Sequence, residues 1–137
     1  ARAPHLDDEA HLAMVEQLYR AWSPGYAFTP EEMKPVKAAI RPRVAEVLAY
    51  YRALRAPGAL LGEARRLAFA PIRVPSMHVH GADDGCIGIA CCEGAEAHYE
   101  ASYELVIVPH AGHFVTREAP EAVNAAILRF FGDGPVA

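Results

Sequence analysis

Apolar residues recur at intervals of three and four positions from about residue 6 to residue 54, which predicts helices that each present one apolar face. The first set consists of Leu12, Val15, Tyr19 and Trp22. The clearest set, expected in a third helix, consists of Val44, Val47, Leu48, Tyr51 and Leu54 or Arg55. This part of the chain is therefore expected to be helical.

Turn and cap residues set the expected ends of these helices. Ser23-Pro24-Gly25 ends the first helix, and Thr29-Pro30-Glu31-Glu32 begins the second with a capping box and a proline at the first helical position. Pro35 lies inside the second helix, so that helix is expected to be kinked or brief. Pro42 is expected in the first turn of the third helix.

A weakly patterned segment comes after the third helix. Ala56-Pro57-Gly58 ends that helix, and residues 57–71 form a connector with a short helix near residues 63–68. The chain is therefore expected to divide into residues 1–56, this connector, and residues 72–137.

After Pro71 the pattern changes to short apolar strands that alternate with helices, as in a parallel α/β sheet. Strands are expected within residues 72–80 and over residues 103–108, and a helix of uncertain bounds is expected over residues 88–98. Two strands leave edges and apolar faces that need further strands. The last helix opens at Pro120, and its expected core face consists of Val123, Ile127, Phe130 and Phe131.

Composition narrows the class of protein. With 137 residues, 53% hydrophobic and 22% charged, the chain is long and apolar enough for one globular domain. Its net charge of -4 offers no basic stripe for nucleic acid, and no apolar stretch approaches the ~20 residues that cross a bilayer. The polar N-terminus and the clustered, odd number of cysteines favour a cytoplasmic protein with reduced thiols.

Candidate acid–base residues come directly after the two predicted strands. Asp84, with Asp83 as the alternative, ends the first strand and loop, and His113 lies in the loop Pro109-His110-Ala111-Gly112-His113-Phe114 after the second. A buried aspartate fixes the tautomer of a histidine and stabilises its charged form, which suits a nucleophilic triad. The 137 residues contain no Gly-x-Ser-x-Gly turn, so the nucleophile is expected outside them.

Other reactive side chains have plainer interpretations. His78 and His80 alternate on one strand face and suggest a metal pair, but no third ligand lies near them in the sequence, so no metal and no cofactor is expected. Cys86 is an alternative nucleophile because it lies on the loop of the acid, although the cysteines lack metal or redox spacing. Glu118 is expected to tie its loop to backbone amides.

These motifs together resemble the C-terminal half of an α/β-hydrolase, and the similarity is greatest to the epoxide hydrolase and haloalkane dehalogenase branch. The matching stretches, in chain order, are Ile72-Arg73-Val74-Pro75, Gly81-Ala82-Asp83-Asp84, Glu104-Leu105-Val106-Ile107-Val108 with the histidine loop, and Arg117-Glu118-Ala119-Pro120. The resemblance implies that residues 1–56 are the latter part of a helical lid and that residues 72–137 are the end of the hydrolase core. It also implies that Asp84 is the triad acid and His113 the base.

In the expected lid, Tyr50-Tyr51-Arg52 resembles the Trp-Tyr-Arg segment of epoxide hydrolases. The resemblance implies that Tyr51 donates a hydrogen bond to the epoxide oxygen as the ring opens, a contact that acts mainly in the transition state. Core packing at helical spacing is the plainer interpretation of Tyr51, and Tyr50 is the alternative donor. Members of this branch use an aspartate nucleophile, whereas esterase relatives use serine.

Two functions from different classes are consistent with these residues. The first is a hydrolase of a small, apolar epoxide or ester, or a dehalogenase of the same fold, whose nucleophile comes from an N-terminal hydrolase half outside these residues. The expected protein partner is that N-terminal half or a second copy of the chain. The second is a non-catalytic remnant or interaction module that keeps the acid and base and pairs through its exposed sheet edge.

Overall fold

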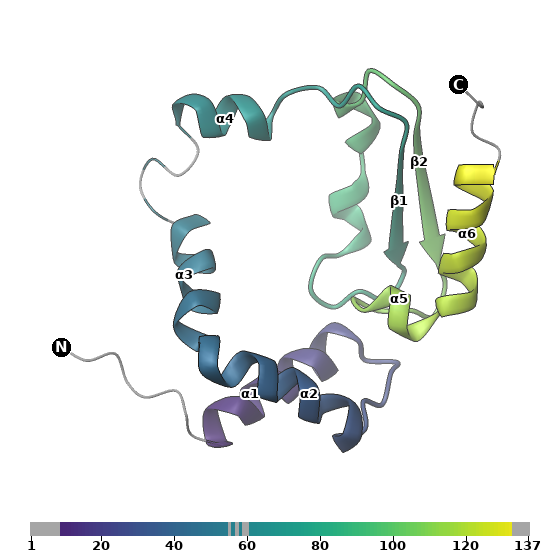
Figure 1. The fold of residues 1–137 in the computed structure, drawn as a ribbon. Coiled ribbons are helices and arrows are strands. Elements are labelled where there is room, and N and C mark those ends of the chain that lie inside the picture. The colour runs from purple at the N-terminus through teal and green to yellow at the C-terminus, as the bar shows by residue number, and fades with distance from the viewer. Residues whose placement is uncertain (1–8, 55, 57, 59–60, 133–137) are drawn as a thin grey trace. The chain divides into compact units, whose positions relative to one another are not determined.

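The structure is a computed structural model that describes residues 9–54, 56, 58 and 61–132. The chain divides into two compact units, one drawn from Ala1–Tyr19 and Phe28–Ala70, the other from Arg20–Ala27 and Pro71–Ala137. The described residues contain six α-helices, three 3-10 helices and two strands (Figure 1). Residues 6–8 of the expected first helix, Arg55 of the third and Pro57 of its expected stop lie outside the described residues.

The end of the first helix and the start of the second lie where the sequence predicts them. Helix α1 (Glu9–Trp22) stops just before Ser23, and its Leu12 side chain is almost completely buried. Helix α2 (Pro30–Ile40) begins with the predicted capping box: the Glu32 N–H donates to Thr29 Oγ1 at 3.2 Å, and the Thr29 N–H donates to Glu32 Oε2 at 2.8 Å. The local cap therefore forms as its sequence requires.

The prolines of the first unit act differently from the expectation. Pro35 does not shorten α2, which continues to Ile40. A proline removes only one backbone donor, and the other hydrogen bonds of the helix remain. Pro42 lies in a separate 3-10 turn, η1 (Arg41–Arg43), and α3 (Val44–Leu54) begins only after that turn. The short helix predicted in the connector is confirmed as α4 (Gly62–Ala68).

The second unit contains a two-stranded parallel sheet. Strand β1 (Ser76–Gly81) pairs with β2 (Tyr103–Val108), with Ser76 opposite Tyr103 and Gly81 opposite Val108 (Figure 1). Parallel strands joined by a helical crossover confirm the predicted α/β class. The carboxyl ends of both strands consequently meet at the same edge of the sheet.

The two faces of this sheet carry different neighbours. Glu104 faces one side and forms an ion pair with Arg129 of α6 (Pro120–Gly132). His78 and His80 face the other side, towards η2 (Ile89–Cys92) and η3 (Ala95–His98), which Figure 1 shows on the opposite side of the strands from α6. The buried hydrophobic residues of this unit are Cys92, Val108, Ala111, Val123 and Ala126.

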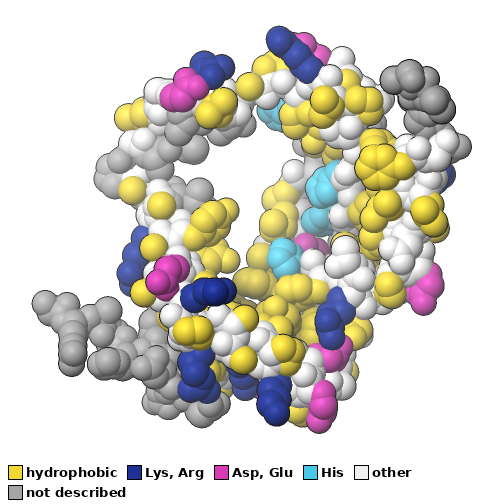
Figure 2. Space-filling view, in the orientation of Figure 1, with side chains coloured by type: hydrophobic (Ala, Val, Ile, Leu, Met, Phe, Trp, Pro, Cys, Tyr) yellow, Lys and Arg dark blue, Asp and Glu magenta, His cyan; other side chains and the backbone are white. Residues whose placement is uncertain are grey.

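Two predictions for the second unit are wrong. Residues 88–98 form the two 3-10 turns η2 and η3 instead of one helix, because Gly94 between them has a left-handed backbone (φ 74°) that breaks helical geometry. In α6 only part of the predicted core face is buried: Val123 is covered, but Phe131 is 76% exposed, and hydrophobic side chains lie on the surface over this helix (Figure 2). A two-stranded sheet is too narrow to cover the whole apolar face of α6.

Among the described residues, no helix is both long and apolar enough to cross a membrane.

Candidate functional site

The loop after β1 holds Asp84 by its own backbone. The Asp84 side chain is only 5% exposed, and its Oδ1 accepts from the N–H groups of Cys86 at 2.7 Å and Ile87 at 2.9 Å. Aspartate commonly closes a turn on the next residues of the chain in this way. Asp84 thus caps the turn after Gly85 as well, which the sequence left as an alternative, and it keeps Oδ2 for another partner.

The loop after β2 carries His113 and is linked to the acid loop. The Ala82 N–H donates to the Val108 carbonyl, and the Asp83 N–H donates to the Ala111 carbonyl, both at 2.9 Å. His110 has a left-handed backbone (φ 59°), which turns the chain sharply after the strand. The two loops therefore form one framework at the carboxyl edge of the sheet.

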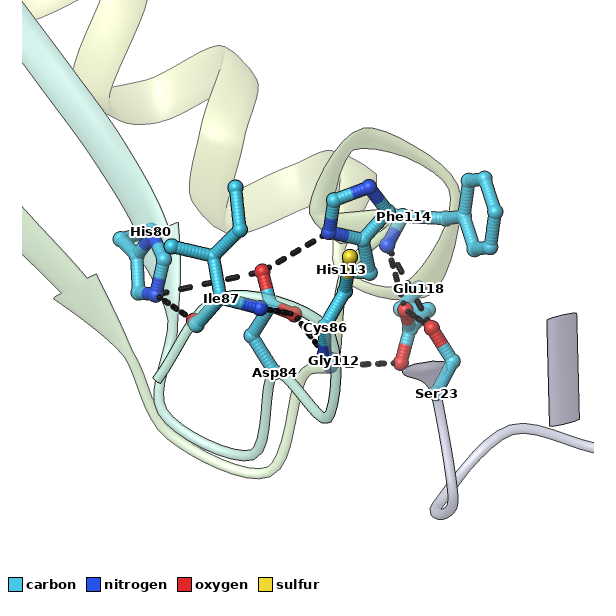
Figure 3. Close-up of polar contacts among 9 residues, drawn as sticks. All are labelled: Ser23, His80, Asp84, Cys86, Ile87, Gly112, His113, Phe114 and Glu118. Atoms are coloured by element: carbon cyan, nitrogen blue, oxygen red, sulfur yellow. Dashed lines mark hydrogen bonds and ion pairs between the residues drawn. The ribbon is translucent and has the colours of Figure 1, made fainter. Parts of the chain in front are cut away.

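These loops bring Asp84 and His113 together, as the sequence predicts. His113 Nδ1 lies 2.9 Å from Asp84 Oδ2 (Figure 3). Asp83 is exposed to solvent. An ionised carboxylate only accepts hydrogen bonds, so Nδ1 carries a proton and donates it, and Nε2 is the ring nitrogen that remains for proton exchange. The His113 side chain is 27% exposed, so a reacting group can reach the ring.

The surroundings of Asp84 keep it ionised. Burial raises the pKa of the Asp84 carboxyl, but hydrogen bonds from the Ile87 N–H, from His113 and from the Cys86 N–H together outweigh burial and hold the pKa below its ordinary value. The negative charge of Asp84 therefore persists at neutral pH, where it stabilises the charged form of His113.

A short segment from the end of α1 holds both loops. The Trp22 carbonyl accepts from the Gly85 N–H at 3.0 Å and from the His113 N–H at 3.1 Å. A Cβ on Gly85 would lie 2.1 Å from the Ala21 carbonyl oxygen, and one on Gly112 would lie 2.6 Å from Ser23 Cα. Glycine is required at both positions because three backbone segments meet there without space for a side chain.

Glu118 fastens the histidine loop, as predicted. Its Oε2 accepts from the Gly112 N–H at 2.7 Å, and its Oε1 accepts from the Phe114 N–H at 3.0 Å and from Ser23 Oγ at 2.6 Å (Figure 3). The sequence indicates Ser23 only as a helix end. Its role depends on a contact between residues 95 positions apart, and no local pattern signals such a contact.

Aromatic rings support the imidazole. The Trp22 ring meets the His113 ring edge-on at a centroid distance of 5.1 Å, and the Phe114 ring does so at 5.2 Å. Such edge-to-face contacts restrict the rotation of the imidazole without using its nitrogens. Hydrogen bonds and packing thus both fix the orientation of His113.

Neighbouring polar residues lie beside the acid. His80 Nε2 is 3.0 Å from the Ile87 carbonyl and 3.9 Å from Asp84 Oδ2. The pKa of His78 is lowered, mainly by burial and also by the nearby His80.

Cys86, the alternative nucleophile on the acid loop, is poorly suited to that role. The pKa of its thiol is raised, mainly by burial and also by the charge of Asp84, so Cys86 stays protonated.

Tyr51 belongs to the first unit, whereas Asp84 and His113 belong to the second. It lies on α3 with 54% of its surface exposed, so it is no core residue of the described unit, and its ring contacts Tyr50 edge-on at 5.5 Å. Its role as a donor stays a prediction.

Comparison with known proteins assigns no family. No protein-family model matches the chain, and a search of curated proteins finds no significant match. The geometry of the site therefore carries the functional argument.

Proposed function

We propose that this chain provides the acid and base of a catalytic triad in a hydrolase of the α/β-hydrolase fold, similar to epoxide hydrolases. The observation that carries this proposal is the 2.9 Å contact between His113 Nδ1 and the buried, ionised Asp84 at the meeting point of two parallel strand ends. Buried carboxylates in such a position orient a histidine and stabilise its cation. The motif resemblance selects the epoxide-hydrolase branch among hydrolases.

The two nitrogens of the His113 ring have different roles in the proposed reaction. A carboxylate nucleophile attacks an epoxide carbon, the ring C–O bond breaks, and the alkoxide oxygen takes a proton from solvent water. His113 Nε2 then removes a proton from water while that water attacks the carbonyl carbon of the ester intermediate. Asp84 stabilises the imidazolium that forms. Collapse of the tetrahedral intermediate expels the alkoxide of the diol, which takes the proton of the new carboxylic acid and leaves the carboxylate regenerated. The imidazolium returns its proton to solvent, which balances the proton taken up when the ring opened.

The nucleophile of this proposal comes from an N-terminal hydrolase half, on a segment other than residues 1–137. Both strands of the described sheet lie at an edge, and α6 leaves Leu128 and Phe131 largely exposed. Within the described residues, the outer edge of each strand is unpaired, and these apolar side chains of α6 are uncovered. Further strands and helices of such a fold would cover these surfaces. These features support a partner segment that completes the sheet.

Tyr51 is the proposed donor to the epoxide oxygen, on the strength of the resemblance alone. Tyr51→Phe keeps the ring and removes the hydroxyl, and the neighbouring Tyr50→Phe is its matched control. We expect slower ring opening in the first variant only.

The proposal is tested by measuring the hydrolysis of a small apolar epoxide and, separately, of an ester. The sample is the protein purified from its own source. We expect His113→Asn to lower turnover by about 10²–10⁴-fold, the usual contribution of a general base. His110→Asn is the control, because His110 lies on the same loop and asparagine tolerates its left-handed backbone. Unchanged turnover in His113→Asn would exclude His113 as the base, and absence of any turnover in the unmodified protein would favour the interaction module.

A further inference from the structure

A second cluster of reactive side chains lies on the sheet face opposite α6. His78 and His80 project from β1, and Cys92 from the turn η2. One ring nitrogen of each histidine and the Cys92 Sγ all lie within 4.8 Å of one another. His80 and Cys92 are buried, at 6% and 5% exposure, and His78 is half-buried. Cys92 is a third candidate ligand that the sequence does not reveal, because only the turn η2 brings it to β1.

One ring nitrogen of each histidine already has an oxygen partner. His80 Nε2 lies 3.0 Å from the Ile87 carbonyl, which leaves Nδ1 for a ligand (Figure 3). His78 Nδ1 lies 3.3 Å from the Tyr103 hydroxyl, which leaves Nε2. Metal-binding histidines characteristically use one ring nitrogen for the ion and the other for an oxygen that fixes the tautomer and ring orientation.

We propose that His78, His80 and Cys92 bind a zinc-class transition-metal ion. Two imidazoles and a thiolate are ligands of intermediate softness, which suit Zn²⁺ and exclude Ca²⁺ or Mg²⁺, whose sites are built from oxygens. Metal bonds of about 2.0–2.3 Å require the ligand atoms to close by roughly 1 Å, which is within the reach of side-chain rotation. The Cys92 thiol loses its proton to solvent as the sulfur–metal bond forms.

Three protein ligands leave one position of a tetrahedral ion for water, because no fourth histidine, cysteine or acid joins this cluster in the described residues. The ion would tie η2, and with it the segment after the acid loop, to β1. This site does not depend on the proposed hydrolase chemistry, since it uses neither Asp84 nor His113.

Titration of the metal-free protein with Co²⁺ tests the site, because a cysteine thiolate bound to Co²⁺ gives a charge-transfer absorption that histidines alone do not. We expect a single Co²⁺ per chain with this absorption, displacement of Co²⁺ by Zn²⁺, and a higher melting temperature with Zn²⁺. Cys92→Ser should abolish the absorption and weaken Zn²⁺ binding by at least about tenfold. The exposed neighbour Cys91 supplies the matched control, and Cys91→Ser should bind as the unmodified protein does.

A second variant keeps the test decisive if Cys92→Ser does not fold. His78→Ala, at a half-buried position, should also weaken Zn²⁺ binding by at least about tenfold. His98→Ala, at an exposed position, should not. The proposal is overturned if the unmodified protein gives no thiolate absorption, if the absorption depends on Cys91 instead, or if His78→Ala binds Zn²⁺ as tightly as the unmodified protein.

Discussion

At the scale of single residues, Asp84 uses both of its carboxylate oxygens. Oδ1 accepts two backbone N–H groups and Oδ2 faces His113, so protonation of this carboxyl would break hydrogen bonds. The sequence identified this aspartate and its histidine because each lies in a glycine-containing loop directly after an apolar strand, and such loops can be recognised from neighbouring residues alone. It left Asp83 as an alternative, since the direction of two adjacent side chains depends on the exact turn.

The lowered pKa of Asp84 predicts a specific pH dependence of stability. Because the folded pKa lies below the unfolded value of about 3.9, the ionised carboxylate stabilises the fold above that value. This contribution is lost as the pH falls through the folded pKa. We therefore expect the free energy of unfolding to drop more steeply between about pH 5 and pH 2 in the unmodified protein than in Asp84→Asn.

Urea unfolding at a series of pH values, with a chelator present, measures this difference. Asp83→Asn is the control, because the Asp83 side chain is exposed, and it should behave as the unmodified protein does. Parallel curves for Asp84→Asn and the unmodified protein would contradict a hydrogen-bonded, ionised carboxylate at this position.

Gly85 gives a second prediction at this scale. A Cβ there would meet the Ala21 carbonyl oxygen at 2.1 Å, so Gly85→Ala forces backbone apart and should cost more than about 1 kcal/mol of stability. Gly88→Ala is the control, because a Cβ there meets nothing within 4 Å and its φ of -64° suits alanine. Equal unfolding midpoints for the two variants would show that the close approach at Gly85 is absent.

At the scale of elements, the loops of the acid and the base are held by a segment distant in sequence. Trp22, the last residue of α1, accepts from the Gly85 and His113 N–H groups, and Ser23 directly after it donates to Glu118, which holds the histidine loop. The sequence predicted α1, the capped start of α2 and both strands, because periodicity and caps act locally. It did not predict the split of residues 88–98 by Gly94, or the role of Ser23, because both depend on backbone geometry and distant partners.

Glu118→Gln tests how the histidine loop is held. The Glu118 carboxylate accepts hydrogen bonds from Ser23, Gly112 and Phe114, and an amide cannot accept all of them. We expect a loss of about 1–3 kcal/mol in the free energy of unfolding. Glu121→Gln, at an exposed position in the first turn of α6, should change stability far less, and an equal loss in both variants would argue against a special role of Glu118.

At the scale of the whole molecule, the described residues contain a sheet of two parallel strands and a helix that leaves Leu128 and Phe131 exposed. The sequence predicted the two strands; that a further segment completes the sheet and carries the nucleophile stays a prediction. The burial of α6 was overestimated because periodicity shows which face is apolar but not how much of it finds a cover.

The central claim is that Asp84 and His113 act on a nucleophile carried by another segment, and the most direct test is the covalent intermediate. We would mix His113→Asn with a small apolar epoxide and measure the intact mass of every polypeptide in the sample. We predict that an ester adduct of substrate mass accumulates outside residues 1–137, because the base that activates water for its cleavage is missing. Turnover as fast as in the unmodified protein with no adduct, or an adduct within residues 1–137, would contradict this claim.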